Sequence, residues 1–348
     1  MRQPRAVVLV AVADFLAMAG AAGCSPEVKI DIGKLVVAHK ASADLWGWSV
    51  DDATLFWTGL NEAGLYALQA VDVQTSTVHS VTAGHTNFGS PQLAASDSLL
   101  FFLADSTDQH SGEGLYQAPL ADRRAGTAVP IATNVWQYSV SFDGACIALV
   151  DASTREMSTI ELATGTRQLF GQASSGSFSP DGTRLLYAKN QGSGATVYLA
   201  DPLNGAGQPF DFPGTIISWD GGTPKRVLQS QPYRVVDLVT GLTQALPDDI
   251  PQFEAFSGEP TDLTEGYYRW TECLDEQVAD DGVTDCVTSQ GLLYRVNLNT
   301  GQRDVVAKYN GAGWTYFAVS QDGQQLAVST SPDSDSDLSL YVKTLAPP

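Results

Sequence analysis

The chain has 348 residues, with 39 Asp and Glu against 19 Lys and Arg, so its formal net charge is −20. A chain this acidic repels the phosphate backbone, which argues against nucleic acid as a partner. Its 32 Gly, its 13 Phe, 12 Tyr and 7 Trp, and a charged fraction of only 17% are typical of many short buried strands joined by turns. This length suits one all-β domain.

The N-terminus has the pattern of an export signal over residues 1–23. Arg2 and Arg5 precede an apolar run, and small residues then lead up to Cys24. The run is too short to span a bilayer. An ordinary signal peptide cut after Ala19 or Ala21 would also fit this pattern.

The residues around the cleavage point carry a more specific signal. The stretch Ala21-Ala22-Gly23-Cys24 resembles the lipobox of bacterial lipoproteins. This resemblance implies that Cys24 is lipidated, that it becomes the first mature residue, and that the lipid attaches the protein to a membrane. Ser25, at the next position, is what that family associates with sorting to an outer membrane; the alternative is a periplasmic protein. We therefore expect a lipid-anchored segment over residues 24–39.

One short hairpin recurs along the rest of the chain. Its clearest copy, residues 177–187, has a short strand, a tight turn at Asp181-Gly182 and a second, more apolar strand. The turns that we expect are Asp51-Asp52, Ser96-Asp97, Asp143-Gly144, Asp181-Gly182, Asp220-Gly221, Glu265-Gly266 and Asp322-Gly323. Their spacing is close to the roughly 40 to 45 residues of a four-stranded propeller blade.

The strands after these turns predict the fold class. Leu99-Leu100-Phe101-Phe102-Leu103 is apolar without alternation, which indicates a strand covered on both faces, as when sheets stack face to face. We therefore predict an all-β fold, a β-propeller of four-stranded blades over residues 40–348. Seven blades fit the anchors, and six is the alternative if the first repeat is misread. The segment 28–37 is expected to close the ring as an outer strand of the last blade.

The repeat resembles a known family. Phe178-Ser179-Pro180-Asp181-Gly182 is similar to the WD40-like β-propeller repeat (PD40), the repeat of TolB-type propellers and of prolyl oligopeptidases. The resemblance extends over most of residues 40–348. It implies a propeller but no particular activity, because the Asp and Gly of the motif make a turn.

The cysteines suit an oxidising compartment. Cys273 and Cys286 flank an acidic insertion, and a disulfide closing this 14-residue loop would stabilise the fold by roughly 3 kcal/mol. Cys146 lies in an apolar strand and is expected to be a buried free thiol. Because neither a CxxC pair nor a Cys/His cluster occurs, a structural metal site is not expected.

Motifs for catalysis or cofactor binding are missing. The chain contains no GxSxG elbow and no glycine-rich phosphate loop, and its four histidines have no ligand spacing within one element. We therefore predict no catalytic, cofactor-binding or metal-binding residues. Asp333, Asp335 and Asp337 alternate as at the start of a calcium loop, but the Gly and Glu of that loop are missing, so calcium stays an alternative only.

A charged surface is the strongest functional signal. In a propeller the loops between second and third strands share one face, and here they contain fifteen carboxylates against two bases, Arg155 and Lys189. We call this surface the acidic loop face; its candidate binding residues are Asp280, Asp281, Asp285, Asp333, Asp335 and Asp337. A face of one sign attracts cationic partners. The alternative is that the charge serves solubility.

These observations together predict a non-catalytic binding or assembly module, a lipoprotein of the bacterial cell envelope. A protein partner with a cationic surface is expected, and a membrane is reached through the N-terminal lipid. The alternative is a propeller enzyme acting on polysaccharide, a lyase or glycosidase, with its site in the central funnel.

Overall fold

A computed structural model of the chain describes residues 31–346. The gaps in this range are 32, 40–43, 50, 62, 95–96, 105–112, 180, 192–193, 206, 211–214, 220–225, 231–233, 238–242, 246–254, 260–261, 279–283, 298–299, 311–314, 321 and 331–337. Within the described residues all regular structure is strand, and no helix is present that could cross a membrane. The predicted all-β class is confirmed.

Four sheets are built alike, from four consecutive antiparallel strands each. The first contains β2 (Asp44–Trp48), β3 (Thr54–Leu60), β4 (Tyr66–Asp72) and β5 (Thr77–Ser80). Two more are β14 (Ser175–Phe178), β15 (Leu185–Gln191), β16 (Gly194–Ala200) and β17 (Gln208–Phe210), and β18 (Thr215–Trp219), β19 (Arg226–Ser230), β20 (Arg234–Asp237) and β21 (Thr243–Ala245). The fourth is β22 (Ala255–Glu259), β23 (Asp262–Val278), β24 (Thr284–Asn297) and β25 (Arg303–Asn310).

One larger sheet joins two such units through a shared strand. Its order is β13-β12-β11-β10-β8-β7-β6, with β9 beside β8. The strands are β6 (Phe88–Ala94), β7 (Leu99–Ala104), β8 (Glu113–Ala121), β9 (Arg124–Ala125), β10 (Val129–Val140), β11 (Cys146–Asp151), β12 (Glu156–Glu161) and β13 (Arg167–Gln172). The first half of β10 pairs with β8 and its second half with β11. This strand is therefore the outer strand of one unit and the inner strand of the next.

The remaining sheet brings the two ends of the described chain together. Its order is β1-β28-β27-β26, from β1 (Lys34–His39), β26 (Thr315–Val319), β27 (Gln325–Thr330) and β28 (Leu338–Thr344). Strand β1 is antiparallel to β28, with Lys34 opposite Val342. The structure thus has an N-terminal strand at the outer edge of this sheet, and it covers Lys34–His39 where the sequence predicted residues 28–37.

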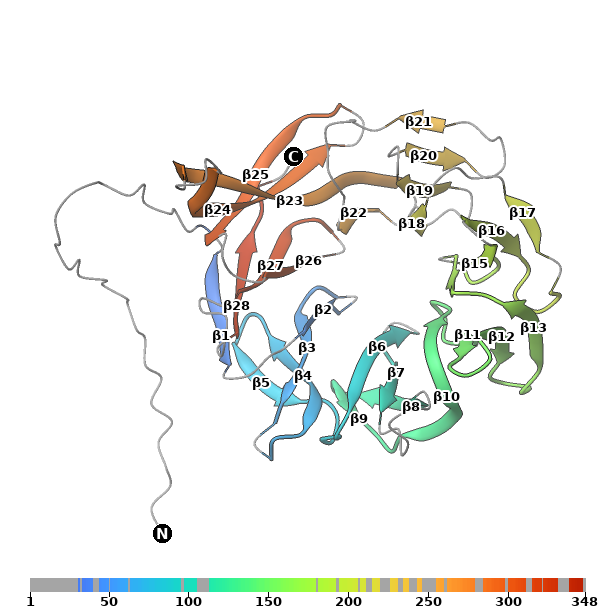
Figure 1. Cartoon of the computed structure of the whole chain (residues 1–348). Coiled ribbons are helices and arrows are strands. Elements are labelled where there is room, and N and C mark those ends of the chain that lie inside the picture. Colours follow the sequence, from blue (N-terminus) through green and yellow to red (C-terminus); the bar gives the residue numbers. More distant parts are fainter. Residues whose placement is uncertain are drawn as a thin grey trace, which may run out of the picture.

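The sheets follow one another around a common centre, and first strands of the units, β2, β6, β18, β22 and β26 among them, border it (Figure 1). Apolar side chains fill the space between neighbouring sheets. Phe56 and Leu68 of one sheet pack with Leu100 and Phe102 of the next, and all four are at most 2% exposed. This packing explains the continuous apolar runs, because the second strands β3, β7, β11 and β27 are buried on both faces.

The recurring turn is held by a serine and an aspartate. In the clearest copy the Ser179 hydroxyl donates to Asp181 Oδ1 (2.6 Å), and the N–H of Arg184 donates to Ser179 Oγ (2.9 Å). Gly182 follows with φ +70°, a conformation that favours glycine. The same arrangement recurs with Ser49 and Asp51, Ser141 and Asp143, and Ser320 and Asp322.

One predicted turn is wrong. Glu265-Gly266 lies inside β23, where Glu265 pairs with Ser257 on β22 and with Asn297 on β24. Glu265 is buried because its carboxylate faces Arg295 (Nε to Oε1, 3.7 Å) and accepts a hydrogen bond from the Tyr267 hydroxyl (2.7 Å). A buried Glu that is paired with a base and followed by Gly therefore resembles a turn in sequence, although it lies within a strand.

The acidic insertion forms an extended hairpin and not only a loop. Past the rest of the sheet, β23 and β24 pair only with each other, from Cys273 opposite Ser289 to Val278 opposite Thr284. The disulfide Cys273–Cys286 joins the two strands of this ribbon, and Cys146 is a buried free cysteine. Figure 1 shows the ribbon reaching away from the body of the protein.

Candidate functional site

Most of the predicted site residues lie outside the described part of the chain. This holds for Cys24 and for Asp280, Asp281, Asp333, Asp335 and Asp337. Asp285 lies on β24, opposite Gln277, but its side chain is not described. The acidic loop face and the lipidation of Cys24 therefore stay predictions.

The described part of the acidic loop face is acidic too. Antiparallel pairing places the junctions β7–β8, β11–β12 and β23–β24 at the same end of their sheets, and the carboxylates there are Glu113, Asp151, Glu156, Glu272, Asp275 and Glu276. Of the two bases, Arg155 makes a cation–π contact, since its guanidinium lies over the Trp136 ring, 3.9 Å from the centroid. The carboxylates there outnumber the bases Arg155 and Lys189, so the described part of this surface has an excess of negative charge.

Several aspartates accept hydrogen bonds within turns, and these bonds lower their pKa values. Asp151 accepts hydrogen bonds from the N–H of Thr154 (2.8 Å) and from the Ser153 hydroxyl (2.8 Å), and these hold its pKa well below the ordinary value. Asp72 and Asp201 also have lowered pKa values, because they accept backbone N–H bonds in the turns after β4 and β16. Ionised carboxylates engaged in this way stabilise turns and are poor proton donors at neutral pH.

Three exposed aromatic side chains lie on the inner strands of their units. Trp46 on β2 is 40% exposed, Trp136 on β10 55% and Tyr316 on β26 41%. Both tryptophans occupy bulges: the register shifts between Leu45 and Gly47, and again across Trp136. A bulge re-aims a side chain and is common next to binding sites.

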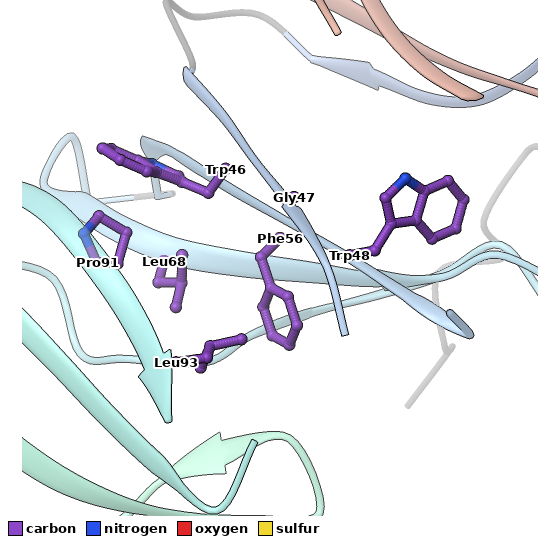
Figure 2. Close-up of a pocket in the computed structure, with 7 residues that line it drawn as sticks. All are labelled: Trp46, Gly47, Trp48, Phe56, Leu68, Pro91 and Leu93. Atoms are coloured by element: carbon purple, nitrogen blue, oxygen red, sulfur yellow. The ribbon is translucent and has the colours of Figure 1, made fainter. Parts of the chain in front are cut away.

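A pocket of about 140 Å³ opens beside Trp46. The residues that line it are Trp46, Gly47, Trp48, Phe56, Leu68, Pro91 and Leu93. Figure 2 shows Trp46 and Pro91 on the same side of β2 as Phe56, Leu68 and Leu93, whereas the ring of Trp48 points away from them. The pocket therefore lies between β2 and β6, walled by an indole on one strand and a proline on the other.

Both indole N–H groups at this place are already used. Trp46 Nε1 donates to Thr58 Oγ1 (3.1 Å), and Trp48 Nε1 donates to the carbonyl oxygen of Ala318 (3.2 Å). These are the only polar side-chain atoms among the lining residues. The side chains at the pocket are therefore apolar apart from these two engaged N–H groups, although the surface that the pocket exposes is as much polar as apolar.

Neighbouring inner strands elsewhere are tied by side chains. Gln92 Nε2 donates to the carbonyl of Tyr138 (3.1 Å), and the N–H of Val140 donates to Gln92 Oε1 (3.0 Å). The Tyr138 hydroxyl donates to the carbonyl of Ser90. Strand β6 is therefore fixed on its β10 side, while the pocket lies on its β2 side.

Sequence reasoning missed this pocket. Its walls come from segments about 45 residues apart, and only the three-dimensional packing brings them together. Two signals were present: the Trp-Gly-Trp run at residues 46–48 and Pro91, which cannot donate to a strand ladder.

Within the described residues, no three His, Cys, Asp or Glu side chains come together as ligands. The aspartates expected as alternative calcium ligands lie outside this part of the chain, so calcium there remains untested.

The comparisons with known proteins identify the fold. No protein-family model matches the chain, and no curated protein matches it in sequence. Among solved structures, an oligogalacturonate lyase in complex with manganese has a TM-score of 0.60 and 13% identity over 94% of this chain and 99% of that one. The β-propeller domain of the Trilobed protease from Pyrococcus furiosus has a TM-score of 0.58 and 11% identity, covering 88% and 98%.

TolB from Acinetobacter baumannii is also similar, with 17% identity and a TM-score of 0.48 over 75% of this chain. The chain spans 65% of that TolB chain. At these identities the likeness shows the fold alone. The fold is that of β-propeller proteins, as the repeats predicted.

Proposed function

We propose that the protein is a non-catalytic binding module, a β-propeller lipoprotein of the bacterial cell envelope that recognises a cationic protein partner through its acidic loop face. In this proposal the ring has seven four-stranded blades. The count treats β10 as shared between two of them and takes the pairing of β1 with β28 as the closure.

The observation that carries the proposal is a contrast between carboxylates and aromatic side chains. The described aspartates with lowered pKa, such as Asp72, Asp151 and Asp201, accept hydrogen bonds within turns. The inner strands, in contrast, expose Trp46, Trp136 and Tyr316. Catalysis by acid and base needs a carboxyl whose pKa lies near the working pH. Recognition of a protein needs aromatic anchors on a rigid frame and a complementary charge.

Export supports the same proposal. The Cys273–Cys286 disulfide suits an oxidising compartment, and the export signal with Cys24 would place the protein at the outer membrane or, without the lipid, in the periplasm. Two acyl chains are needed for stable anchoring, because one chain binds only marginally. Mass spectrometry of the mature N-terminus tests this: an unmodified Cys24, or cleavage elsewhere, would overturn it.

A polysaccharide lyase or glycosidase is the second candidate. It is favoured by the likeness in fold to an oligogalacturonate lyase, at 13% identity.

Charge reversal tests the proposed recognition. Asp280, Asp281, Asp285, Asp333 and Asp335 are replaced together by Lys, and a control reverses five carboxylates of the opposite face, Asp122 and Glu161 among them. Association with a Lys-rich peptide should weaken strongly in the first variant, little in the control, and should weaken for the unaltered protein as salt rises. Equal behaviour of both variants would show that the charge serves solubility.

A further inference from the structure

Trp136 presents an open aromatic surface on β10. The residue is 55% exposed, although the guanidinium of Arg155 already covers one face of its ring at 3.9 Å from the centroid. The rest of the ring surface therefore faces solvent. Aromatic faces attract cations, and tryptophan attracts them most strongly, so this surface is suited to a second positive group.

The backbone around this ring has an unusual conformation. Trp136 lies in a bulge, since the register of β10 with β11 shifts between Val135 and Gln137. Asn134, just before the bulge, and Arg155, in the loop after β11, both have φ +59°. Residues other than glycine rarely adopt a positive φ, and such positions are concentrated at binding sites.

Hydrogen bonds fix this arrangement before anything binds. Asn134 Nδ2 donates to Asp151 Oδ2 (3.1 Å) and to Ser153 Oγ (2.7 Å), which ties β10 to the loop after β11. In that loop the N–H of Arg155 donates to the carbonyl of Asp151 (3.0 Å), and the N–H of Ala173 donates to the carbonyl of Arg155 (3.1 Å). A group that is fixed in advance loses less entropy when it binds.

Carboxylate residues border the ring on both sides. Val135, the residue before this tryptophan, lies opposite Glu113 on β8 and opposite Asp151 on β11. Cross-strand neighbours have Cβ atoms about 4.5–5.5 Å apart. Glu156 follows Arg155 directly in the chain, so three carboxylates stand against one guanidinium at this place. The local excess of negative charge favours a cation over an anion or a neutral group.

From this geometry we propose that the open face of the Trp136 indole receives a cationic side chain, Lys or Arg, of the protein partner. Glu113, Asp151 and Glu156 supply the attraction. Arg155 has two effects, because it holds the ring in place and, as a like charge, limits how tightly the incoming cation binds. This inference rests on the proposed function, since it names an anchor for the same cationic partner.

A small probe tests this place apart from the rest of the surface. The full-length protein is labelled with fluorotryptophan, and the Trp136 signal in fluorine NMR is assigned by its loss in Trp136→Phe. n-Butylammonium chloride, which has the charged end of a lysine side chain, should shift this signal in a saturable way. Sodium chloride at the same ionic strength and neutral n-butanol should not, because neither supplies an organic cation.

Variants extend the test to a Lys-rich peptide, with binding measured by calorimetry. Trp136→Ala should weaken binding about two- to fivefold, the loss expected for one exposed cation–π contact. Arg155→Ala should tighten binding, since it removes a like charge and uncovers the ring. If circular dichroism shows that Trp136→Ala is not folded, Trp136→Leu, which also lacks a π face, decides.

Each variant has a matched control. Trp46→Ala removes the other bulge tryptophan of an inner strand and should leave the affinity for the peptide unchanged. Arg124→Ala removes an exposed base on β9, and it should tighten binding less than Arg155→Ala does.

The outcomes separate this inference from the proposed function. If the peptide binds more weakly in high salt but equally to Trp136→Ala and to the unaltered protein, the acidic loop face stands and the anchor at Trp136 is overturned. If n-butylammonium shifts the Trp136 signal and the peptide does not bind, the cation site stands and the proposed function is overturned. An equal shift with sodium chloride would show screening alone and overturn the anchor.

Discussion

The indole Nε1 of Trp48 donates a hydrogen bond to the carbonyl oxygen of Ala318 at 3.2 Å, although the two residues are 270 positions apart in the chain. The contact joins β2 to β26. A second contact reinforces it nearby, where Gln325 Nε2 donates to the carbonyl of Asp52 (3.3 Å). The first and the last repeats are therefore joined by hydrogen bonds between their sheets, while the pairing of β1 with β28 attaches the N-terminal strand to the last sheet.

This contact leads to a first prediction. Trp48→Phe keeps an apolar ring but removes the N–H donor, so the free energy of unfolding should fall by about 1 kcal/mol. Urea denaturation followed by fluorescence measures it. Trp136→Phe, on the exposed part of β10, is the control and should change stability less. Equal losses in the two variants would contradict a role of the Trp48–Ala318 bond.

The repeated turn gives the second prediction. Ser179 is 1% exposed, and its hydroxyl both accepts from the N–H of Arg184 and donates to Asp181. Ser179→Ala should destabilise the fold by roughly 1–3 kcal/mol, since a buried donor loses its partner. Thr127→Ala, at an exposed position, should change stability by less than about 0.5 kcal/mol. A neutral Ser179→Ala variant would show that the turn does not depend on this serine.

The fold could be predicted largely because these turns are local. Ser, Asp and Gly lie within a few residues, so their spacing indicates the hairpin directly, as at Asp143-Gly144 and Asp322-Gly323. Glu265-Gly266 was wrongly predicted as a turn, because the burial of Glu265 depends on its ion pair with Arg295, thirty positions away on the neighbouring strand. Local chemistry is visible in sequence, whereas a partnered buried charge is not.

The candidate site could be predicted much less well. The pocket depends on a bulge at Trp46 and on Pro91 of another sheet, and no local pattern fixes their distance. The acidic loop face was predictable in position from topology alone, because it needs only the order of strands.

A third prediction concerns acid. The Ser49 hydroxyl lowers the pKa of Asp51 below its ordinary 3.8, helped by the N–H of Ala53 and by Arg123, while burial opposes them. A carboxyl with a depressed pKa in the folded state contributes stability above pH 3.8, and this contribution is lost as the pH falls further. Urea midpoints measured from pH 6 down to pH 2 should drop less steeply in Asp51→Asn. Ser49→Ala should flatten the curve in part, and an unchanged slope in both variants would contradict the account.

A fourth prediction concerns the ribbon beyond the sheet. Because the strands next to the disulfide pair only with each other, replacing Cys273 and Cys286 by Ala should speed hydrogen exchange in residues 273–289 far more than in the rest of the chain. Isolated two-stranded ribbons are marginal in water. Exchange that rises throughout the protein would show that the disulfide supports the whole fold.

In the unaltered protein Cys146 should resist alkylation, since burial raises the pKa of its thiol.

The central claim is that the protein binds a cationic protein partner and does not cleave polysaccharide. The most direct measurement titrates the full-length protein in parallel with a Lys-rich peptide and with oligogalacturonate, following heat of binding and the absorbance of unsaturated sugar products. The account predicts salt-sensitive binding of the peptide, lost on reversal of the acidic loop face, and no sugar product. The account would be contradicted if oligogalacturonate binds with release of unsaturated product and the peptide does not bind.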